Sequence, residues 1–361
     1  MAQGGYPGIG RATEGLACHL LGADTAHTLL LVVRSDRPVP EQVLKQVQPP
    51  HRILPVDAEL RSLRDQVLLG LRLRQARVDL YHAPYYGMAV YPGVRYVVAL
   101  HDTIPARFPE YWSRHQAWII RNWQRRVVTH AACVITGSHA AVDDIAEIYG
   151  VSAGKMIVSP WGAVEWTADA RAPKAGIERP YLLCVCTNKP HKNLVRLIQA
   201  YRAAAIGQVS FPDLIVAGGW SERYPEAAEA LDGANAAGSH GMVCNIRNPS
   251  DGELRYLYEN AVGFVFPSLY EGFGLPVLEA MQAGIPVTAS TTPAVIEVCG
   301  SAALMFDPLN TEAMASAIRR LATEPDLRRD LRAAGAERLK SFGWEETVAQ
   351  TLRAYEVALC G

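Results

Sequence analysis

The stretch that decides the fold is Pro267-Ser-Leu-Tyr-Glu-Gly-Phe-Gly-Leu-Pro-Val-Leu-Glu-Ala-Met-Gln-Ala-Gly-Ile-Pro-Val287. It follows an apolar run, Gly263 to Phe266, that we predict as a buried strand. Pro276 favours the first turn of a helix. Gly272 and Gly274 allow the backbone to approach a ligand closely, and the N–H groups that open a helix attract phosphates and sugar hydroxyls. The stretch therefore predicts a strand, a glycine loop and a helix that begins at a binding site.

Two carboxylates and one lysine are the candidate polar groups of this site. Glu271 and Glu279 stand eight positions apart, at the two edges of the predicted loop and helix. An ionised carboxylate only accepts hydrogen bonds, so it suits the hydroxyls of a sugar or a ribose. Lys192 stands just ahead of the predicted helix Leu194 to Ala205. Taken alone, the same residues also fit two solvated glutamates and an exposed lysine at a helix start.

Short β-rich runs alternate with helical patterns along almost the whole chain, which is typical of parallel sheets covered by helices. The predicted strands are Thr28 to Val33, Leu80 to His82, Tyr96 to Leu100, Ala132 to Thr136, Met156 to Val158, Tyr181 to Val185, Leu214 to Ala217, Gly263 to Phe266 and Pro286 to Ala289. The predicted helices include Ser138 to Ile148, Leu194 to Ala205, Thr311 to Thr323 and Leu327 to Lys340. We place the interdomain linker at Ala163 to Arg179, which has no strong periodicity.

Length and composition agree with two soluble domains. At 361 residues the chain is long enough for two cores, and 49% apolar residues allow a compact interior. The net charge of −1 argues against a nucleic-acid binder. Residues 1–165 carry 17 basic against 14 acidic side chains and the remainder carries 18 against 22, so the front half is the more basic.

The cysteines and the longest apolar runs bear on the location of the protein. The seven cysteines are scattered and form no C-x-x-C pair, which indicates reduced thiols in a cytoplasmic protein. No apolar run approaches the roughly 18 residues that span a bilayer, so we expect any membrane contact to be peripheral.

The segment Tyr270-Glu-Gly-Phe-Gly-Leu-Pro-Val-Leu-Glu-Ala-Met281 resembles the E-x7-E signature of glycosyltransferase family 4, a GT-B family of retaining nucleotide-sugar transferases. Gly8-Ile-Gly-Arg11 resembles the N-terminal glycine loop of that family, and His101-Asp-Thr-Ile-Pro105 its histidine at a strand end. Lys192-Asn193 and Phe342-Gly-Trp344 follow in the expected order. The resemblance covers most of the chain.

The resemblance implies a GT-B fold, in which two Rossmann-like doubly wound domains face a central cleft. Residues 1–165 would bind the acceptor and residues 166–343 the nucleotide sugar, and helix 344–361 would pack back on the first domain. Carried over by position, the donor-binding residues would be Gly8, Gly10, Lys192, Glu271, Gly272, Phe273, Gly274, Leu275 and Glu279. Glu279 would bind the ribose and Lys192 the diphosphate, whereas Glu271 and His101 would contact the transferred sugar, and we count His101, Glu271 and Lys192 as catalytic.

Retention in this family is described as front-face substitution, in which the departing phosphate takes the proton of the acceptor hydroxyl. We expect no metal and no cofactor, because His101-Asp102 is an isolated pair and the chain has no acidic D-x-D-type motif at a strand end. Two departures from the family pattern stand out. Members usually begin with a strand before the glycine loop, which is missing ahead of Gly8, and the arginine expected before Lys192 is absent from Cys186-Thr-Asn-Lys-Pro-His191.

Two basic amphipathic segments are candidates for peripheral contact with the inner face of a membrane. Leu60 to Gln75 carries Leu60, Leu63, Val67, Leu68 and Leu71 on one face and Arg61, Arg64, Arg72 and Arg74 elsewhere. Glu110 to Arg126 mixes Trp112, Trp118 and Trp123 with Arg114, Arg121, Arg125 and Arg126. The alternative is that both helices pack on their own sheet.

We therefore expect a glycosyltransferase that moves a hexose to a saccharide or lipid-linked saccharide. The stretches Ala99-Leu-His-Asp-Thr-Ile-Pro105 and Phe264 to Gly274 are similar to the mannosyltransferase branch, which favours GDP-mannose as donor. The alternatives are a UDP-sugar donor and a catalytically weak homologue that serves as a partner subunit in glycan assembly. A nicotinamide-dependent oxidoreductase, suggested by Gly5-x-x-Gly8-x-Gly10, lacks the preceding strand that such a pattern requires.

Overall fold

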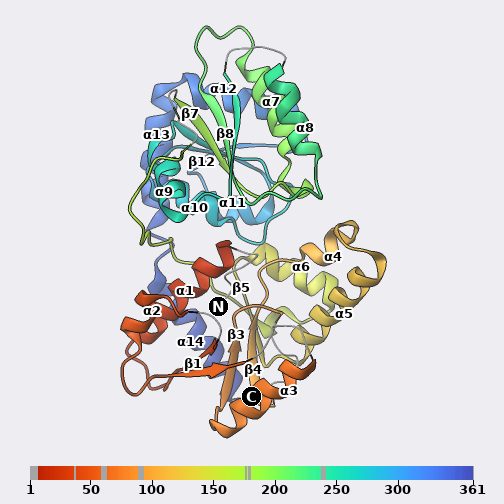
Figure 1. Cartoon of the computed structure of the whole chain (residues 1–361), viewed down its shortest axis with the longest axis vertical. Coiled ribbons are helices and arrows are strands. Elements are labelled where there is room, and N and C mark those ends of the chain that lie inside the picture. The colour runs from red at the N-terminus through yellow and green to blue at the C-terminus, as the bar shows by residue number, and fades with distance from the viewer. Residues whose placement is uncertain are drawn as a thin grey trace. The chain divides into compact units, whose positions relative to one another are not determined.

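The computed structural model of the chain describes residues 7–35, 38–57, 63–87, 93–174, 177, 180–236 and 241–360. The chain forms two compact units (Figure 1). Unit 1 consists of Met1–Val164 together with Phe342–Gly361, and unit 2 consists of Glu165–Ser341.

Unit 1 is an α/β unit with parallel strands. Its elements are α1 (Pro7–Gly22), β1 (Leu30–Arg34), α2 (Glu41–Gln46), β2 (Arg52–Val56), α3 (Leu63–Gln75), β3 (Leu80–Ala83), β4 (Arg95–Ala99), α4 (Ile104–Arg107), η1 (Pro109–Tyr111), α5 (Arg114–His130), β5 (Cys133–Thr136), α6 (His139–Tyr149), η2 (Ala153–Lys155), β6 (Met156–Val158) and α14 (Trp344–Cys360). β1 pairs with β2 in one sheet, and a second sheet has the order β3-β4-β5-β6.

Alternating residues of the larger sheet in unit 1 pack against helices on its two faces. On one face, Leu73 of α3, Val127 of α5 and Ile145 of α6 belong to the same buried cluster. On the other face, Val97 of β4 packs in a cluster with Tyr355 of α14. α3 and α5 therefore cover the same side of the sheet, and the C-terminal helix covers the opposite side.

Trp344 fastens α14 to the rest of unit 1. Its indole N–H donates to the carbonyl of Ala163 over 2.9 Å, and its ring stacks on His19 of α1 with centroids 4.9 Å apart. A Cβ added at Gly15 or at Gly162 would approach the ring to 2.3 or 2.5 Å. The tryptophan of the Phe342-Gly-Trp344 motif thus fits between two backbone segments that only glycine allows this close.

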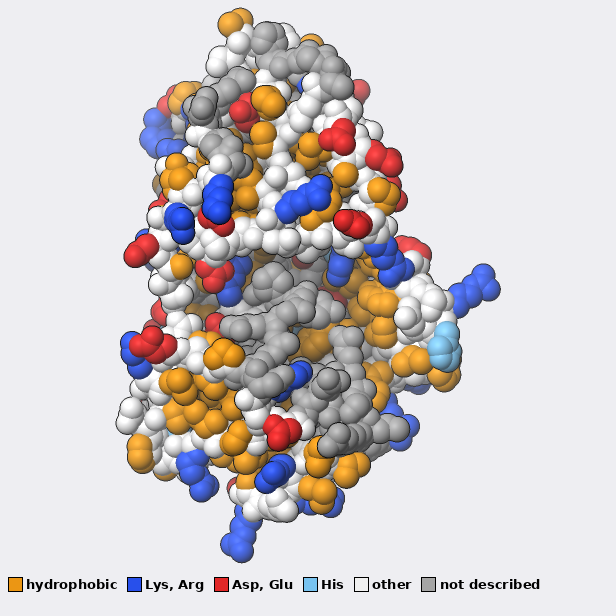
Figure 2. Space-filling model, viewed as in Figure 1, with side chains coloured by type: hydrophobic (Ala, Val, Ile, Leu, Met, Phe, Trp, Pro, Cys, Tyr) orange, Lys and Arg blue, Asp and Glu red, His pale blue; other side chains and the backbone are white. Residues whose placement is uncertain are grey.

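The surface of unit 1 includes exposed apolar side chains. In the space-filling view, hydrophobic side chains gather around α1 and α2 (Figure 2), where Leu44 is 45% exposed. No helix within the described ranges is long and apolar enough to span a membrane.

Unit 2 contains one six-stranded parallel sheet covered by helices. Its elements are β7 (Tyr181–Val185), η3 (Pro190–Lys192), α7 (Leu194–Ala205), β8 (Asp213–Gly218), α8 (Glu226–Ala236), β9 (Val243–Arg247), α9 (Asp251–Asn260), β10 (Gly263–Phe266), α10 (Leu275–Gln282), β11 (Val287–Ser290), α11 (Pro293–Cys299), β12 (Ala303–Phe306), α12 (Thr311–Thr323) and α13 (Pro325–Leu339). The strand order is β12-β11-β10-β7-β8-β9. This α/β architecture with parallel sheets confirms the predicted fold class.

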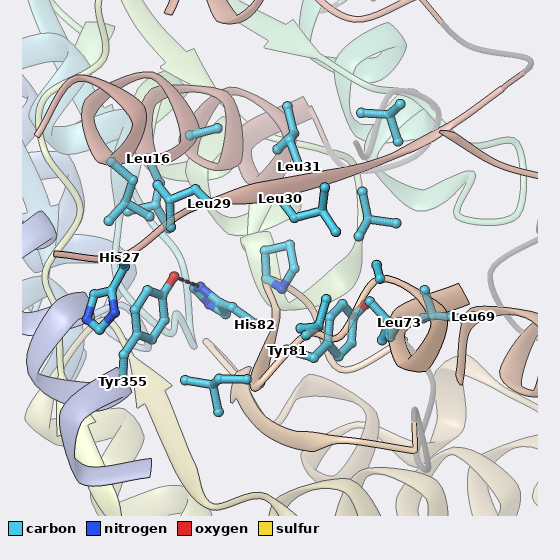
Figure 3. A pocket seen from close by; sticks show the side chains of 18 of the residues that line it. Leu16, His27, Leu29, Leu30, Leu31, Leu69, Leu73, Tyr81, His82 and Tyr355 are labelled. Atoms are coloured by element: carbon cyan, nitrogen blue, oxygen red, sulfur yellow. Dashed lines mark hydrogen bonds between the residues drawn. The ribbon is translucent and has the colours of Figure 1, made fainter. Parts of the chain in front are cut away.

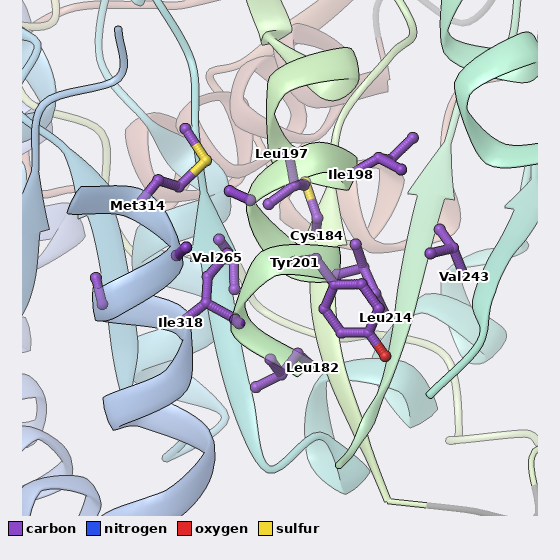
Figure 4. Packing of buried hydrophobic residues seen from close by; sticks show 14 of the residues in the cluster. Leu182, Cys184, Leu197, Ile198, Tyr201, Leu214, Val243, Val265, Met314 and Ile318 are labelled. Atoms are coloured by element: carbon purple, nitrogen blue, oxygen red, sulfur yellow. The ribbon is translucent and has the colours of Figure 1, made fainter. Parts of the chain in front are cut away.

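The main core of unit 2 lies between the sheet and α7, α8 and α12 (Figure 4). Leu197 of α7 and Ile318 of α12 meet Val265 of β10 there, and all three are fully buried. Phe264 and Phe266, the neighbours of Val265 on β10, point to the opposite face because side chains alternate along a strand. Their rings are 6.1 Å apart.

The strand order of unit 2 reverses between β7 and β10. From β7 the chain adds β8 and β9 on one side of the sheet, and then β10, β11 and β12 on the other side. In open parallel sheets, ligands bind beyond the carboxyl ends of the strands at such a reversal point. The loops after β7 and β10 are therefore the place to look for a site in unit 2.

Candidate functional site

The loops that follow β7 and β10 lie next to each other at the reversal point of unit 2. Lys192, in the loop after β7, donates from Nζ to Oε1 of Glu271, in the loop after β10, over 2.5 Å. Their side chains are 16% and 11% exposed. The structure thus brings together the lysine and the first glutamate of the sequence analysis, 79 positions apart, as a partly buried ion pair.

Hydrogen bonds join the two loops and fix this ion pair. The amide of Asn193 donates to the carbonyls of Pro267 and Pro308 over 3.1 and 2.8 Å, and Asn193 itself has a positive φ of 61° at the start of α7. The backbone N–H of Leu269 donates to the carbonyl of His191 over 2.8 Å. Burial, together with the charges of Lys192 and Lys189, lowers the pKa of His191 to about 2.

The glycine loop leads into α10 as the sequence predicts. Gly274 precedes the helix with φ of 119°, a conformation that side chains with a Cβ rarely adopt. α10 begins at Leu275, and the first N–H groups of a helix have no partner within the helix itself. Gly272 and Phe273 are buried, so the loop is packed and not a loose surface turn.

Glu279 lies in α10 and is not the solvated glutamate of the alternative interpretation. It is buried, with 1% exposure, and accepts a hydrogen bond from Oη of Tyr258 over 2.7 Å. The ring of Trp166 packs against Tyr258 with centroids 5.8 Å apart. The hydrogen bond with Tyr258 directs the Glu279 side chain of α10 toward α9.

Two further groups that the sequence analysis did not single out support the loop after β7. The side chain of Asn188 accepts from the N–H of Ser221 over 2.8 Å and donates to the carbonyls of Ser221 and Tyr224. Gly218, at the end of β8, has φ of 139°, and a Cβ there would lie 2.2 Å from the carbonyl oxygen of Cys186. The sequence signal that could have pointed to this position is a glycine at the end of a strand, next to a candidate binding loop.

His101 lies in unit 1, directly after β4. Both of its ring nitrogens are buried without a hydrogen-bond partner, and its ring packs on Trp161 with centroids 4.5 Å apart. Burial, and then the nearby His82, lowers the pKa of His101 to about 3, so the ring is neutral near pH 7. The neighbouring Asp102 accepts from the N–H of Ile104 over 3.0 Å.

Gly8 and Gly10 also belong to unit 1, and here the structure corrects the expected glycine loop. Both lie in the first turn of α1, which begins at Pro7. Proline at the first position is compatible with a helix, because its fixed φ suits the helix and its missing N–H would have no partner there.

In the parts of the chain that the structure describes, no group of three or more His, Cys, Asp or Glu side chains could hold a metal ion.

Two family models match the chain. Residues 6–163 match the model of Glycosyltransferase Family 4, and residues 168–338 match the model of Glycosyl transferases group 1. An O-antigen chain mannosyltransferase B of Escherichia coli is 28% identical over 297 residues, which are 79% of this chain and 76% of that protein. An MMP alpha-(1->4)-mannosyltransferase of Mycolicibacterium hassiacum is 28% identical over 255 residues, 67% of this chain and 59% of its own.

A solved structure of similar fold is the Anabaena protein HepE in complex with UDP and glucose. It superposes with a TM-score of 0.71 at 17% identity and covers 99% of this chain and 98% of its own. Together the two family models account for nearly all of the chain, and each falls on one structural unit. The chain therefore belongs to glycosyltransferase family 4 and is a glycosyltransferase with the GT-B fold.

Proposed function

We propose that the protein transfers mannose from GDP-mannose to a saccharide or lipid-linked saccharide, with retention of the anomeric configuration. The observation that carries the proposal is the Lys192–Glu271 ion pair at the reversal point of unit 2. It offers one cation for a diphosphate and one carboxylate for sugar hydroxyls. The choice of mannose rests on the mannosyltransferases among the relatives.

The ion pair gives the two residues a defined part in donor binding. Without donor, each side chain compensates the charge of the other in a partly desolvated site. A diphosphate that reaches Lys192 competes with Glu271 for the ammonium group, which leaves the carboxylate available to a sugar hydroxyl. Lys192 then stabilises the charge that develops on the leaving group. The backbone of Gly272, Phe273, Gly274 and Leu275 would lie beside the transferred sugar.

Glu279 is proposed to accept hydrogen bonds from the ribose. Tyr258 holds one of its oxygens, and a carboxylate has further acceptor sites for a ribose hydroxyl. On the unit 1 side, Gly8 and Gly10 would contribute the N-terminal turn of α1, where backbone N–H groups favour an anion. Both assignments follow the positions of the family signature.

His101 would act as a neutral hydrogen-bonding group. Burial holds its pKa near 3, so at neutral pH the imidazole can donate to a sugar hydroxyl but brings no charge. Its two ring nitrogens have no protein partner, which leaves them available to a ligand. In the proposed front-face reaction the acceptor oxygen bonds to the anomeric carbon, the bond to the diphosphate breaks, and a phosphate oxygen takes the acceptor proton. No metal or cofactor takes part.

A UDP-sugar is the second candidate donor. The observation that favours it is the solved complex of HepE with UDP and glucose, a structure of the same fold. The diphosphate and sugar contacts proposed above serve both donors. The donor experiment described below therefore decides which nucleotide base the donor carries.

The acceptor side is proposed to lie on unit 1, which would touch the inner face of the membrane from the cytoplasm. Val67 and Leu71 of α3 are 62% and 48% exposed, and Trp118 and Ile119 of α5 are 65% and 44% exposed. Both helices cover the same side of the sheet. Exposed aromatic and basic side chains on neighbouring helices favour a membrane interface.

Some residues of these two helices pack inside unit 1 instead of facing outward. Leu73 packs α3 on the sheet, so this helix is both a core helix and a partly apolar surface. Trp123 is not exposed, because it donates from its indole N–H to the carbonyl of Tyr86 over 3.1 Å. Leu60 and Arg61 lie outside the described residues.

The test of the reaction is nucleotide release from GDP-mannose and a panel of UDP-sugars by the purified protein. We expect release from GDP-mannose, and a loss of about 100-fold or more in Lys192→Ala and Glu271→Gln. Arg320→Ala, which removes an exposed pair with Glu324, is the matched control and should keep full turnover. Undiminished turnover in both site variants would refute the roles of Lys192 and Glu271. No release from any donor would favour the partner-subunit alternative.

Membrane contact is tested by flotation with liposomes that contain or lack anionic lipid. We expect the protein to float with anionic liposomes, and the double variant Trp118→Ser, Leu71→Ser to stay at the bottom of the gradient. Val209→Ser, an exposed apolar residue of unit 2, is the control. Absence of the wild-type protein from both lipid fractions contradicts the proposal.

A further inference from the structure

Two cysteines lie side by side at the carboxyl end of β7, where the loop that carries Lys192 begins. Their sulfur atoms are 3.8 Å apart. Cys184 is fully buried, and Cys186, which follows the last residue of β7, is half-buried. Side chains two positions apart point to the same face of an extended chain, so both thiols pack in the core between the sheet and α7 (Figure 4). We call Cys184 and Cys186 the thiol pair.

The thiol pair lies within electrostatic reach of the Lys192–Glu271 ion pair. The hydrogen bond with Cys186, and then burial, raise the pKa of Cys184 well above its ordinary value. The charge of Lys192 lowers this pKa and the charge of Glu271 raises it, so both charges act on the buried thiol. A chemical change in the thiol pair therefore takes place beside the two groups that the proposed function assigns to the donor.

The sheet holds the two cysteines differently. Cys184 pairs with Val216 of β8 inside the six-stranded sheet. Cys186 donates its N–H to the carbonyl of Ala217 over 3.0 Å, and after it the chain leaves the sheet as the eight-residue loop 186–193. The hydrogen bonds of Asn188 hold the loop two residues further on. A displacement of Cys186 would therefore strain the loop and move Lys192 within it.

We propose that peroxide converts the thiol pair into a disulfide that displaces the loop 186–193 and weakens donor binding, and that a thiol reductant reverses the change. A disulfide requires the two sulfur atoms to approach from 3.8 Å to about 2.0 Å. Because Cys184 is fixed in the core, most of this approach falls on Cys186 and on the backbone that follows it. The effect on the donor rests on the proposed function, whereas the disulfide itself does not.

The oxidation consumes one peroxide molecule and two thiols. Cys186 is the more accessible thiol, and its deprotonated sulfur attacks a peroxide oxygen. The O–O bond breaks, Cys186 becomes a sulfenic acid, and the released hydroxide takes up the proton of that thiol as water. The sulfur of Cys184 then attacks the sulfur of Cys186. The S–S bond forms, the S–O bond breaks, and the departing hydroxide takes the proton of Cys184 as a second water. Intracellular disulfides are usually of this transient, redox-sensing kind.

The experiment treats the whole protein with hydrogen peroxide and then with dithiothreitol. After peroxide, we expect the peptide that contains both cysteines to be lighter by two hydrogen atoms, and hydrogen exchange of the loop 186–193 to become faster. Nucleotide release should fall about tenfold or more, because a displaced Lys192 no longer meets the diphosphate in the correct geometry. Both changes should disappear after dithiothreitol. Each activity is compared with that of the same sample before treatment.

Cys186→Ser tests the assignment, since a hydroxyl group cannot form the disulfide. We expect this variant to retain its own untreated activity through the peroxide step. Cys244→Ser removes another half-buried cysteine of unit 2 and is the matched control. It should be inactivated by peroxide and restored by dithiothreitol like the wild type.

Three results would overturn the proposal. One is a wild-type protein in which both thiols of the pair stay reduced under peroxide. Another is a disulfide that changes neither the exchange of the loop nor nucleotide release. The third is equal inactivation of Cys186→Ser. The mass and exchange measurements need no donor. A protein that releases nucleotide from no donor would therefore contradict the proposed function, and these two measurements would still decide on the disulfide and on the displacement of the loop.

Discussion

At the scale of single residues, the central feature is a charge pair that is neither fully buried nor exposed. Lys192 and Glu271 are 16% and 11% exposed, so solvent screens their attraction less than it screens a surface pair. Removal of one partner leaves the other charge partly desolvated and uncompensated, which costs more than the loss of an exposed pair. Truncation of either partner is therefore expected to destabilise the site.

We predict that Lys192→Ala lowers the free energy of unfolding by roughly 2 kcal/mol, as expected for an uncompensated charge in a partly buried site. Arg320→Ala, whose pair with Glu324 is 46% and 44% exposed, should cost about 0.5 kcal/mol or less. Urea unfolding of both variants measures the difference. Equal costs would mean that the Lys192–Glu271 pair behaves as a surface pair.

The lowered pKa values of three histidines predict that the protein loses stability below neutral pH. Burial lowers the pKa of His82 to about 4, of His101 to about 3 and of His191 to about 2. The unfolded chain takes up these protons near pH 6.5, but the folded chain does not, so unfolding is favoured as the pH falls below about 6.5. Each histidine contributes up to about 1.4 kcal/mol per pH unit in that window.

The measurement is the urea midpoint at pH 7 and at pH 5. We expect a lower midpoint at pH 5, and a smaller drop in His101→Gln, which removes one of the three groups. Identical drops in the variant and the wild type would mean that His101 takes up its proton in the folded state.

At the scale of helices and strands, the sequence predicts the central strands and misses three others. β2, β9 and β12 were not predicted, and each lies at an edge of its sheet. Edge strands are covered less completely, so their sequences lack the continuous apolar run of a buried strand. β2 also contains Pro55, which is tolerated at an edge but argues against a central strand.

The site residues that lie in one continuous stretch of sequence could be predicted, whereas contacts between residues of distant elements could not. The glycine loop, α10 and both glutamates could be predicted because they lie in one continuous stretch. The partner of Glu279 could not, because Tyr258 comes from another helix and meets it only through the packing of α9 and α10. The first turn of α1 at Gly8 and Gly10 was missed because the glycines suggested a loop more strongly than Pro7 suggested a helix start.

Gly218 gives a prediction at this scale, since it lets the end of β8 approach the loop that carries Lys192. Gly218→Ala would place a Cβ 2.2 Å from a backbone oxygen at φ of 139°, so we expect a loss of about 3 kcal/mol or more. Gly150→Ala, at φ of 69° with nothing within 4 Å, should cost only about 1 kcal/mol. Thermal unfolding of both variants compares them, and a cost for Gly218→Ala no larger than for Gly150→Ala contradicts this close approach.

At the scale of the whole molecule, the two units differ in how complete their sheets are. Within the described residues, unit 2 has one six-stranded sheet, whereas unit 1 has a two-stranded and a four-stranded sheet with a cavity of about 610 Å³ between them (Figure 3).

Donor binding offers a prediction that separates the units. GDP should stabilise unit 2, which holds the proposed diphosphate and ribose contacts, by about 2.7 kcal/mol at a concentration 100 times its Kd. Hydrogen exchange with and without GDP measures this by segment. We expect the strongest protection in the loops 186–193 and 267–274. Protection confined to unit 1 would contradict the placement of the nucleotide.

The most direct test of the proposed reaction is the anomeric configuration of its product. The protein is incubated with GDP-mannose and a saccharide acceptor, and the new glycosidic bond is analysed by NMR. The account predicts a mannosylated product with the anomeric configuration of the donor, formed by the wild type and not by Glu271→Gln. A product of inverted configuration, or transfer from UDP-sugars with none from GDP-mannose, would contradict it.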